Sequence, residues 1–349
     1  MKLQFSRLDI LFALSLLVPL SASAHHGRGE FFEQPVGEIE GVVVDVRWRN
    51  PHVTITVQES AQDGSEELWV LEGSDAGTLA RRGVADGHVR VGDRIRAAGS
   101  ISNRRERWLA TSNILLPSGT ELVFGRTGNP RWSANHIGGE PLPAEGTITE
   151  EASAGGIFRL WMSNTGTPYV VEEEPPLTPA ARAAWQAYDG LRHDPVLDCE
   201  IPGMPRVMTV VGARPIQFER QGEDILLRSE NYNLTRLIHM AADEDPGDVP
   251  TSPLGYSRGR WEGETLVVTT SRISWPYFDL PPLIGIPQSE EVEIEERFTL
   301  TEGRLVYDFR AYDPVNFTAP IEKTGYKAWS WHPGLTLATD ACEDYVEVD

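Results

Sequence analysis

The residues best suited to chemistry in this chain are three histidines, His25, His26 and His52. Removal of a signal peptide over residues 1–24 would make His25 the mature N-terminus, so that a free α-amine stands beside two imidazoles. An amine and neutral imidazoles form a nitrogen-rich ligand set that copper favours. We therefore predict a copper site at these three histidines; the alternative is that the histidine pair is only a soluble, flexible terminus.

The spacing between these histidines allows them to meet. A first strand is expected over residues 37–49, and His52 follows its far end. The twelve residues 25–36 extend about 40 Å, which matches the thirteen-residue strand within about one residue. The N-terminal arm can therefore fold back along the strand to His52, with Phe31 and Phe32 holding it against apolar surface.

The leader predicts export to the periplasm. Lys2 and Arg7 precede an apolar run over residues 10–20, and Ala22-Ser23-Ala24 has the small residues that a signal peptidase requires. The run is too short to span a bilayer, and no later stretch holds eighteen unbroken apolar residues. We expect no transmembrane segment in the mature chain.

Charge and cysteine content narrow the partners and the compartment. The 349 residues carry a formal net charge of -21, and an acidic surface repels phosphate backbones, so nucleic acid is not an expected partner. The two cysteines, Cys199 and Cys342, can form a disulfide in an oxidising compartment. Two unpaired thiols are the alternative.

Residues 25–124 predict an OB-like five-stranded β barrel. Runs of alternating and β-branched residues give five strands with one helix between the third and the fourth, which is the order of an OB-type barrel. Gly41 inside the first run predicts a bulge or sharp bend. The expected strands cover residues 36–50, 52–57, 67–71, 94–101 and 108–116, and Ser74 is expected to cap a helix that continues through Arg81.

Residues 125–195 are rich in proline and glycine and are expected to form a connector with one helix, which Thr178 caps and Pro179 begins. Residues 196–349 predict a larger antiparallel up-and-down (lipocalin-like) β barrel, with a sandwich as the alternative. Short turns separate the expected strands. These strands cover residues 206–211, 215–220, 224–229, 233–240, 255–261, 265–271, 291–300, 304–311 and 323–331.

An apolar connection over residues 273–284 is unusual between two strands. One interpretation is a lid that contributes Trp275, Tyr277 and Phe278 to a pocket for a small apolar molecule. The alternative is a plug that only covers the apolar end of the barrel, because apolar loops more often pack than bind.

The common enzyme signatures are missing: the sequence contains no G-x-S-x-G, HExxH, G-x-G-x-x-G, Walker or CxxC motif. Over residues 25–124 the chain resembles an exported bacterial domain-of-unknown-function family (number six-one-five-two). The resemblance rests on the His-His start, Trp48-Arg49-Asn50-Pro51-His52, Leu79-Ala80-Arg81-Arg82-Gly83 and Val91-Gly92-Asp93. The second half resembles other uncharacterised exported proteins through residues 199–206 and 255–268, but it lacks their histidines near Tyr256 and Gln288. Neither resemblance implies an activity.

Three classes of function remain open. The first is a binding protein, with copper at the N-terminal histidines and a small apolar molecule in the second barrel. The second is an enzyme, either a copper-dependent oxidase or oxygenase or a metal-free isomerase or cyclase acting on a hydrophobic substrate. Oxygen consumption in the presence of a reductant separates a copper oxygenase from a copper binder. The third is a structural partner in the cell envelope, which binds neither metal nor small molecule.

Overall fold

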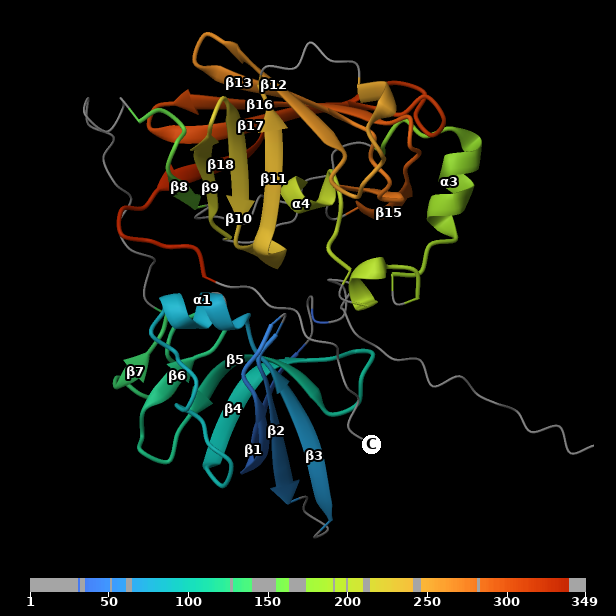
Figure 1. Ribbon diagram of the computed structural model, residues 1–349. Coiled ribbons are helices and arrows are strands. Elements are labelled where there is room, and N and C mark those ends of the chain that lie inside the picture. The colour runs from blue at the N-terminus through green and yellow to red at the C-terminus, as the bar shows by residue number, and fades with distance from the viewer. Residues whose placement is uncertain are drawn as a thin grey trace, which may run out of the picture.

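The described residues form two β-structures, one within residues 36–137 and one within residues 160–331 (Figure 1). The computed structural model describes residues 31, 35–50, 52–60, 65–125, 128–139, 155–162, 174–190, 192–198, 200–209, 214–240, 246–280 and 283–338. Across this part of the chain, no helix combines the length and the apolar character needed to cross a bilayer. The mainly β fold agrees with the alternating pattern of the sequence.

The N-terminal sheet has the strand order β3-β2-β1-β4-β5-β6-β7. Because β3 also pairs in parallel with β5, the first five strands close into a ring. This ring, with helix α1 (Ala76–Arg81) between β3 and β4, is the OB-like arrangement that the sequence predicts. The strands are β1 (Val36–Arg47), β2 (Thr54–Ser60), β3 (Glu66–Glu72), β4 (Arg94–Ile101), β5 (Trp108–Leu115), β6 (Glu121–Val123) and β7 (His136–Ile137).

Local sequence features explain how this sheet bends and how its helix begins. The pairing of β1 with β2 shifts register between Val43 and Asp45, so the irregularity predicted at Gly41 lies in the predicted strand but a few residues after that glycine. A Cβ atom on Gly41 would lie 2.2 Å from the Gln58 carbonyl oxygen, so the close approach of the two strands requires glycine there. Asp75, not Ser74, caps α1, because its carboxylate accepts a hydrogen bond from the Thr78 N–H at 2.7 Å.

The C-terminal barrel closes in the order β10-β11-β12-β13-β16-β17-β18-β8-β9. Its pairings are antiparallel, as predicted, except that β11 and β12 pair in parallel through Ile238 and His239. The strands are β8 (Leu160–Met162), β9 (Ile216–Gln221), β10 (Asp224–Ser229), β11 (Leu234–His239), β12 (Tyr256–Glu262), β13 (Thr265–Ser271), β16 (Glu293–Thr301), β17 (Arg304–Tyr312) and β18 (Ile321–Trp331).

The segment expected to be only a connector is partly built into both sheets. Within residues 125–195, β7 pairs with β6 of the N-terminal sheet, and β8 pairs with β9 and β18 of the barrel. The predicted helix is present as α3 (Pro179–Gln186), and the Thr178 side chain accepts a hydrogen bond from the Ala181 N–H. Short 3-10 turns lie at η2 (Pro195–Asp198), η3 (Asn231–Asn233) and η4 (Pro246–Asp248).

The strand predicted over residues 206–211 is wrong over its described part, where helix α4 (Arg206–Thr209) forms instead. Tertiary contacts override the β-branched pattern there, because the Thr209 hydroxyl donates to the Asp279 carbonyl oxygen at 2.7 Å and the Arg206 guanidinium binds two carboxylates. The apolar connection between β13 and β16 forms a separate hairpin of β14 (Tyr277–Leu280) and β15 (Leu283–Pro287).

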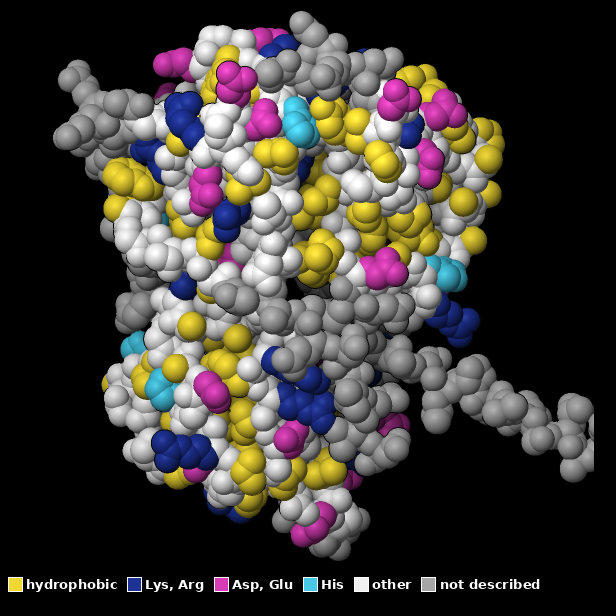
Figure 2. All heavy atoms as spheres, viewed as in Figure 1, with side chains coloured by type: hydrophobic (Ala, Val, Ile, Leu, Met, Phe, Trp, Pro, Cys, Tyr) yellow, Lys and Arg dark blue, Asp and Glu magenta, His cyan; other side chains and the backbone are white. Residues whose placement is uncertain are grey.

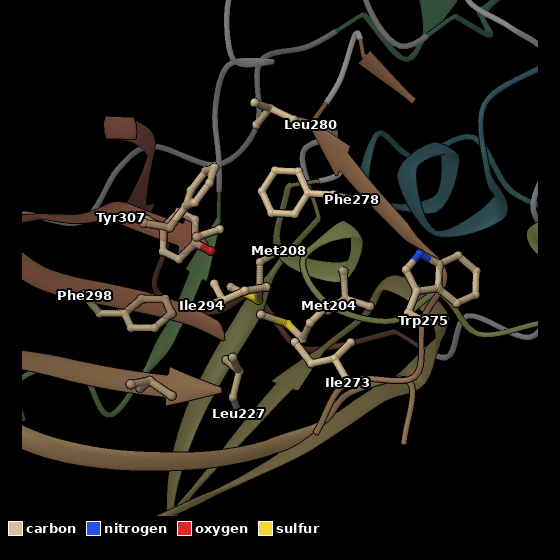
Figure 3. Packing of buried hydrophobic residues seen from close by; sticks show 14 of the residues in the cluster. Met204, Met208, Leu227, Ile273, Trp275, Phe278, Leu280, Ile294, Phe298 and Tyr307 are labelled. Carbon is tan, nitrogen blue, oxygen red and sulfur yellow. The ribbon is translucent and has the colours of Figure 1, made fainter. Parts of the chain in front are cut away.

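The hairpin belongs to the hydrophobic core of the barrel. The Phe278 side chain is fully buried, and its ring centroid lies 5.2 Å from that of Phe317. In Figure 3, the Phe278 ring lies among the packed residues, between Tyr307 and Met208 in this view, and Trp275 lies on the opposite side of Met204. Phe278, Asp279 and Leu280 of β14 are buried, and Tyr277 is half-buried.

The surface carries both signs of charge. On the face shown in Figure 2, acidic and basic side chains are interspersed over both β-structures. Exposed arginines of β4 pair with glutamates of β1, as Arg94 does with Glu40 at 2.9 Å. Such exposed pairs contribute little to stability and keep the sheet well solvated.

Candidate functional site

His52 lies where the chain enters β2, beside the residues that follow β3. The Val53 N–H donates to the Ser74 carbonyl oxygen at 3.2 Å, and the Gly73 N–H donates to the Val53 carbonyl oxygen at 2.8 Å. These two bonds continue the pairing of β2 with β3 past the ends of both strands. The backbone on each side of His52 is therefore held in a defined place.

The imidazole of His52 has one nitrogen anchored to the backbone. Its Nδ1 atom lies 3.1 Å from the Gly73 carbonyl oxygen, and a carbonyl only accepts hydrogen bonds, so this contact selects the tautomer with the proton on Nδ1. In that tautomer Nε2 carries the lone pair that a metal can bind. Metal-ligating histidines commonly donate their other ring N–H to a carbonyl or a carboxylate in this way.

Glu72 places a carboxylate beside the same imidazole. Its side chain is 7% exposed, and its Oε1 atom lies 3.6 Å from His52 Nδ1. The other oxygen, Oε2, accepts a hydrogen bond from Trp108 Nε1 at 2.8 Å and pairs with Arg105 at 3.4 Å. The carboxylate is thus held from one side by β5 and its preceding turn, while its second oxygen faces the histidine.

Phe31 brings the N-terminal arm to this place. The Arg105 guanidinium lies 3.7 Å from the Trp108 ring centroid and 5.6 Å from the Phe31 ring centroid. Phe31 follows His25 by six positions, and such a segment extends up to about 20 Å. His25 and His26 themselves lie outside the described residues, as does Phe32.

Within the described ranges, no group of three or more histidine, cysteine, aspartate or glutamate side chains could hold a metal ion. Of the three predicted copper ligands, the structure describes His52 alone. The predicted disulfide between Cys199 and Cys342 concerns two residues outside the described ranges. It stays a prediction.

The three predicted ligand-binding residues of the hairpin have different surroundings. Phe278 and Trp275 are both buried in the core, whereas Tyr277 is half-buried and its ring lies 6.5 Å from that of Trp275. Successive residues of a strand point to opposite faces, which separates Tyr277 from Phe278 and leaves Trp275 on the side of Tyr277. The structure therefore brings Trp275 and Tyr277 together and directs Phe278 elsewhere.

A buried ion cluster that the sequence analysis missed lies next to this hairpin. Arg206 holds Asp194 through two hydrogen bonds of 2.9 Å and contacts Asp279 at 3.2 Å. Asp279 also accepts the Gly285 N–H at 2.7 Å. Burial raises the pKa of Asp279 above its usual range, while Arg206 opposes that shift.

Tyr188 faces the same cluster from the end of α3. Its ring centroid lies 5.0 Å from that of Tyr277, and a Cβ atom on Gly285 would overlap the Tyr188 ring. Burial, and then the nearby carboxylates of Asp194 and Asp279, raise the pKa of the Tyr188 phenol well above its ordinary value, so this phenol stays protonated. The sequence around α3 does not predict the contact between Tyr188 and the hairpin, because Tyr188 and Tyr277 lie about ninety residues apart.

The middle of the barrel is occupied by a second polar network. The Arg236 guanidinium donates to Ser257 at 2.9 Å, to Thr270 at 2.7 Å and to Glu296 at 3.1 Å, and the Tyr307 hydroxyl donates to the same glutamate at 3.1 Å. All five residues are nearly or fully buried and come from five successive strands of the barrel. These side chains bond one another, so the network stabilises the interior instead of offering a site.

Residues 14–107 match a family of unknown function (DUF6152). The matched segment reaches from before the N-terminal arm to the turn that precedes β5, and it includes His52, Glu72 and α1. This agrees with the family resemblance recognised in the sequence. No curated protein and no solved structure matches the chain.

Proposed function

We propose that this chain is an exported, periplasmic binding protein whose N-terminal sheet binds copper. The ligands are the α-amine and imidazole of His25 and the Nε2 atom of His52, with His26 as the further imidazole. Copper is bound well by such sets of neutral nitrogen donors.

The contact that carries this proposal is the hydrogen bond between His52 Nδ1 and the Gly73 carbonyl oxygen at 3.1 Å. It fixes the tautomer and the orientation of the ring before any metal arrives, which lowers the cost of binding. Phe31 supports the same proposal, because it lies against Arg105, close to Glu72 and His52, and is only about six positions from His25 in the chain. Glu72 supplies negative charge next to the ring.

The barrel supplies the second part of the proposal, a site for a small apolar molecule beside Trp275, Tyr277 and Phe278. The ring of Trp275, which is buried, lies 6.5 Å from that of Tyr277, which is partly exposed, at the start of the hairpin. Phe278, the next residue of the strand, packs in the core against Phe317.

The copper proposal is tested by competition with a chromophoric chelator on the mature protein, which begins at His25. Affinity for Cu(II) should fall at least about tenfold in His52→Ala, and also in a variant with one extra glycine before His25, because the glycine separates the α-amine from the imidazole. His88→Ala is the matched control, since it removes an imidazole from the loop between α1 and β4 of the same β-structure, and it should bind as the unaltered protein does. Equal affinity in all four proteins would contradict the proposal.

A further inference from the structure

Several buried polar atoms near the hairpin have no hydrogen-bond partner. Among the described residues, four buried side-chain atoms outside the guanidinium groups are in this situation: the indole nitrogens of Trp69 and Trp275, the Tyr188 hydroxyl and the Gln288 carbonyl oxygen. Three of the four belong to residues around β14 and β15. Such a grouping needs an explanation, because an unpartnered buried polar group costs roughly 1–3 kcal/mol.

The three residues are joined by direct contacts. The side-chain amide of Gln288 donates to the Trp275 carbonyl oxygen at 2.9 Å, and a second bond of 3.0 Å to the Met204 carbonyl oxygen fixes the same amide. The Trp275 ring lies 6.5 Å from that of Tyr277, which in turn lies 5.0 Å from that of Tyr188. The residues that carry the unpartnered atoms therefore form one contiguous group between the hairpin, α3 and the segment before α4.

The chemistry of these atoms defines a complementary group. Trp275 and Tyr188 offer an N–H and an O–H donor, and Gln288 offers a carbonyl acceptor whose amide side is already occupied. A hydroxyl group on a ligand satisfies both requirements, because its oxygen accepts from the donors and its hydrogen is donated to the amide oxygen. The aromatic rings of Trp275, Tyr277 and Tyr188 favour a flat apolar body.

The charge of the neighbouring ion cluster and the donors of the site disfavour an ionised ligand. Arg206 faces the two carboxylates of Asp194 and Asp279, so the adjacent cluster carries a formal charge of about -1 and repels anions. A cation, for its part, cannot accept hydrogen bonds from Trp275 and Tyr188. An uncharged molecule fits both conditions.

We infer that Trp275, Tyr188 and Gln288 form the polar end of a site for an uncharged aromatic or alicyclic molecule that carries a hydroxyl group. The inference rests on the proposed small-molecule site of the barrel and adds the class of ligand to it. Tyr277 covers the apolar body of the ligand, and its partial exposure places the site at the edge of the core. The inference does not involve the copper ligands.

Calorimetric titration of the mature protein with three probes tests this inference. 2-Naphthol carries the hydroxyl group on an apolar ring pair, naphthalene lacks the hydroxyl group, and 2-naphthoate replaces it with an anion. The expected result is binding of one 2-naphthol per chain, at least tenfold tighter than binding of either other probe.

Two conservative variants locate the binding. Trp275→Phe and Tyr188→Phe each remove one donor and keep a ring, so each should weaken 2-naphthol binding about tenfold and leave naphthalene binding unchanged. Trp69→Phe is the matched control, because it removes the remaining unpartnered indole nitrogen from the N-terminal sheet, and it should bind 2-naphthol normally.

The outcomes separate this inference from the proposal beneath it. Equal binding of naphthalene and 2-naphthol would overturn the inference and support the apolar site. Binding of neither probe would overturn both, and the unpartnered atoms would then be solvated by water alone. Tight 2-naphthol binding that is unchanged in both variants would overturn the assigned residues. If a variant fails to fold, the comparison of 2-naphthol with naphthalene and 2-naphthoate on the unaltered protein still tests the class of ligand.

Discussion

Lys327 shows how burial sets the chemistry of a single residue. The side chain is buried in β18, and its Nζ atom donates to the Met208 carbonyl oxygen at 2.6 Å, which satisfies a carbonyl of α4. Burial lowers the pKa of Lys327 to about 7, because the charged ammonium loses its hydration. The pKa of a lysine in an unfolded chain is about 10.4.

This difference predicts a pH dependence of stability. Between about pH 7 and pH 10 the unfolded chain binds a proton at Lys327 that the folded chain does not, so the free energy of unfolding rises with pH, by on the order of 1 kcal/mol per pH unit. Below pH 7 both states are protonated and this contribution to the slope ends. In Lys327→Met the rise should be absent.

Urea unfolding at pH 7.5, 8.5 and 9.5 measures the effect. Lys323→Met, which removes a half-buried lysine from the same strand, should keep the slope of the unaltered protein. Parallel pH dependences for the unaltered protein and Lys327→Met would show that burial does not shift this amine.

Residues whose function comes from their own atoms could be found in the sequence, and residues that act through a distant partner could not. His52 could be proposed as a ligand from the sequence because an imidazole can bind a metal through its own nitrogen atoms. Glu72 and Arg105 gave no local signal, because they meet only through the parallel pairing of β3 with β5. The cluster of Arg206 with Asp194 and Asp279 depends in the same way on three separate segments.

At the scale of elements, hydrophobic alternation and turn residues located the strands well. The strands predicted at residues 224–229 and 265–271 coincide with β10 and β13. The three-residue strand β8 escaped prediction because it lies among prolines and glycines and pairs through only two residues with each neighbour. The helix α4 was not predicted, because contacts of its side chains with the ion cluster and the hairpin, not the local sequence pattern, determine its conformation.

The close approach of β1 to β2 gives a prediction at this scale. In Gly41→Ala the new Cβ atom would lie 2.2 Å from the backbone oxygen of Gln58, so the strands must separate, at a cost of about 1–3 kcal/mol in the free energy of unfolding. In Gly37→Ala the nearest atom, at 2.7 Å, is the end of the Ile101 side chain, which can rotate away. Chemical denaturation should show the larger loss for Gly41→Ala; equal losses would contradict the assigned register.

At the scale of the whole molecule, a buried ion cluster joins the N-terminal sheet to the barrel. Arg81, from the end of α1, donates two hydrogen bonds of 2.7 Å to Glu230, whose side chain is 1% exposed. Arg214 lies 3.8 Å from Glu230 and 3.4 Å from Asp75, the residue that caps α1. Figure 1 shows α1 on the side of the N-terminal sheet that faces the barrel. The two β-structures are therefore coupled through α1.

Removal of the central carboxylate should weaken this coupling. Glu230→Ala leaves Arg81 and Arg214 without their shared partner, and breaking such a buried pair costs about 3–5 kcal/mol. Differential scanning calorimetry should resolve two unfolding transitions in the variant where the unaltered protein shows one. Glu219→Ala, which removes an exposed partner of Arg228, is the control and should change stability by less than about 1 kcal/mol. A single, unshifted transition in Glu230→Ala would show that the contact does not couple the two parts.

The most direct test of the whole account is the electron paramagnetic resonance spectrum of the mature protein loaded with one equivalent of Cu(II). Nitrogen hyperfine structure counts the nitrogen atoms bound to the metal. The account predicts nitrogen coupling from the N-terminal amine and from imidazoles, with one fewer coupled nitrogen in His52→Ala and an altered spectrum when a glycine precedes His25. An identical spectrum in all three proteins would contradict copper binding by His52 and the N-terminus.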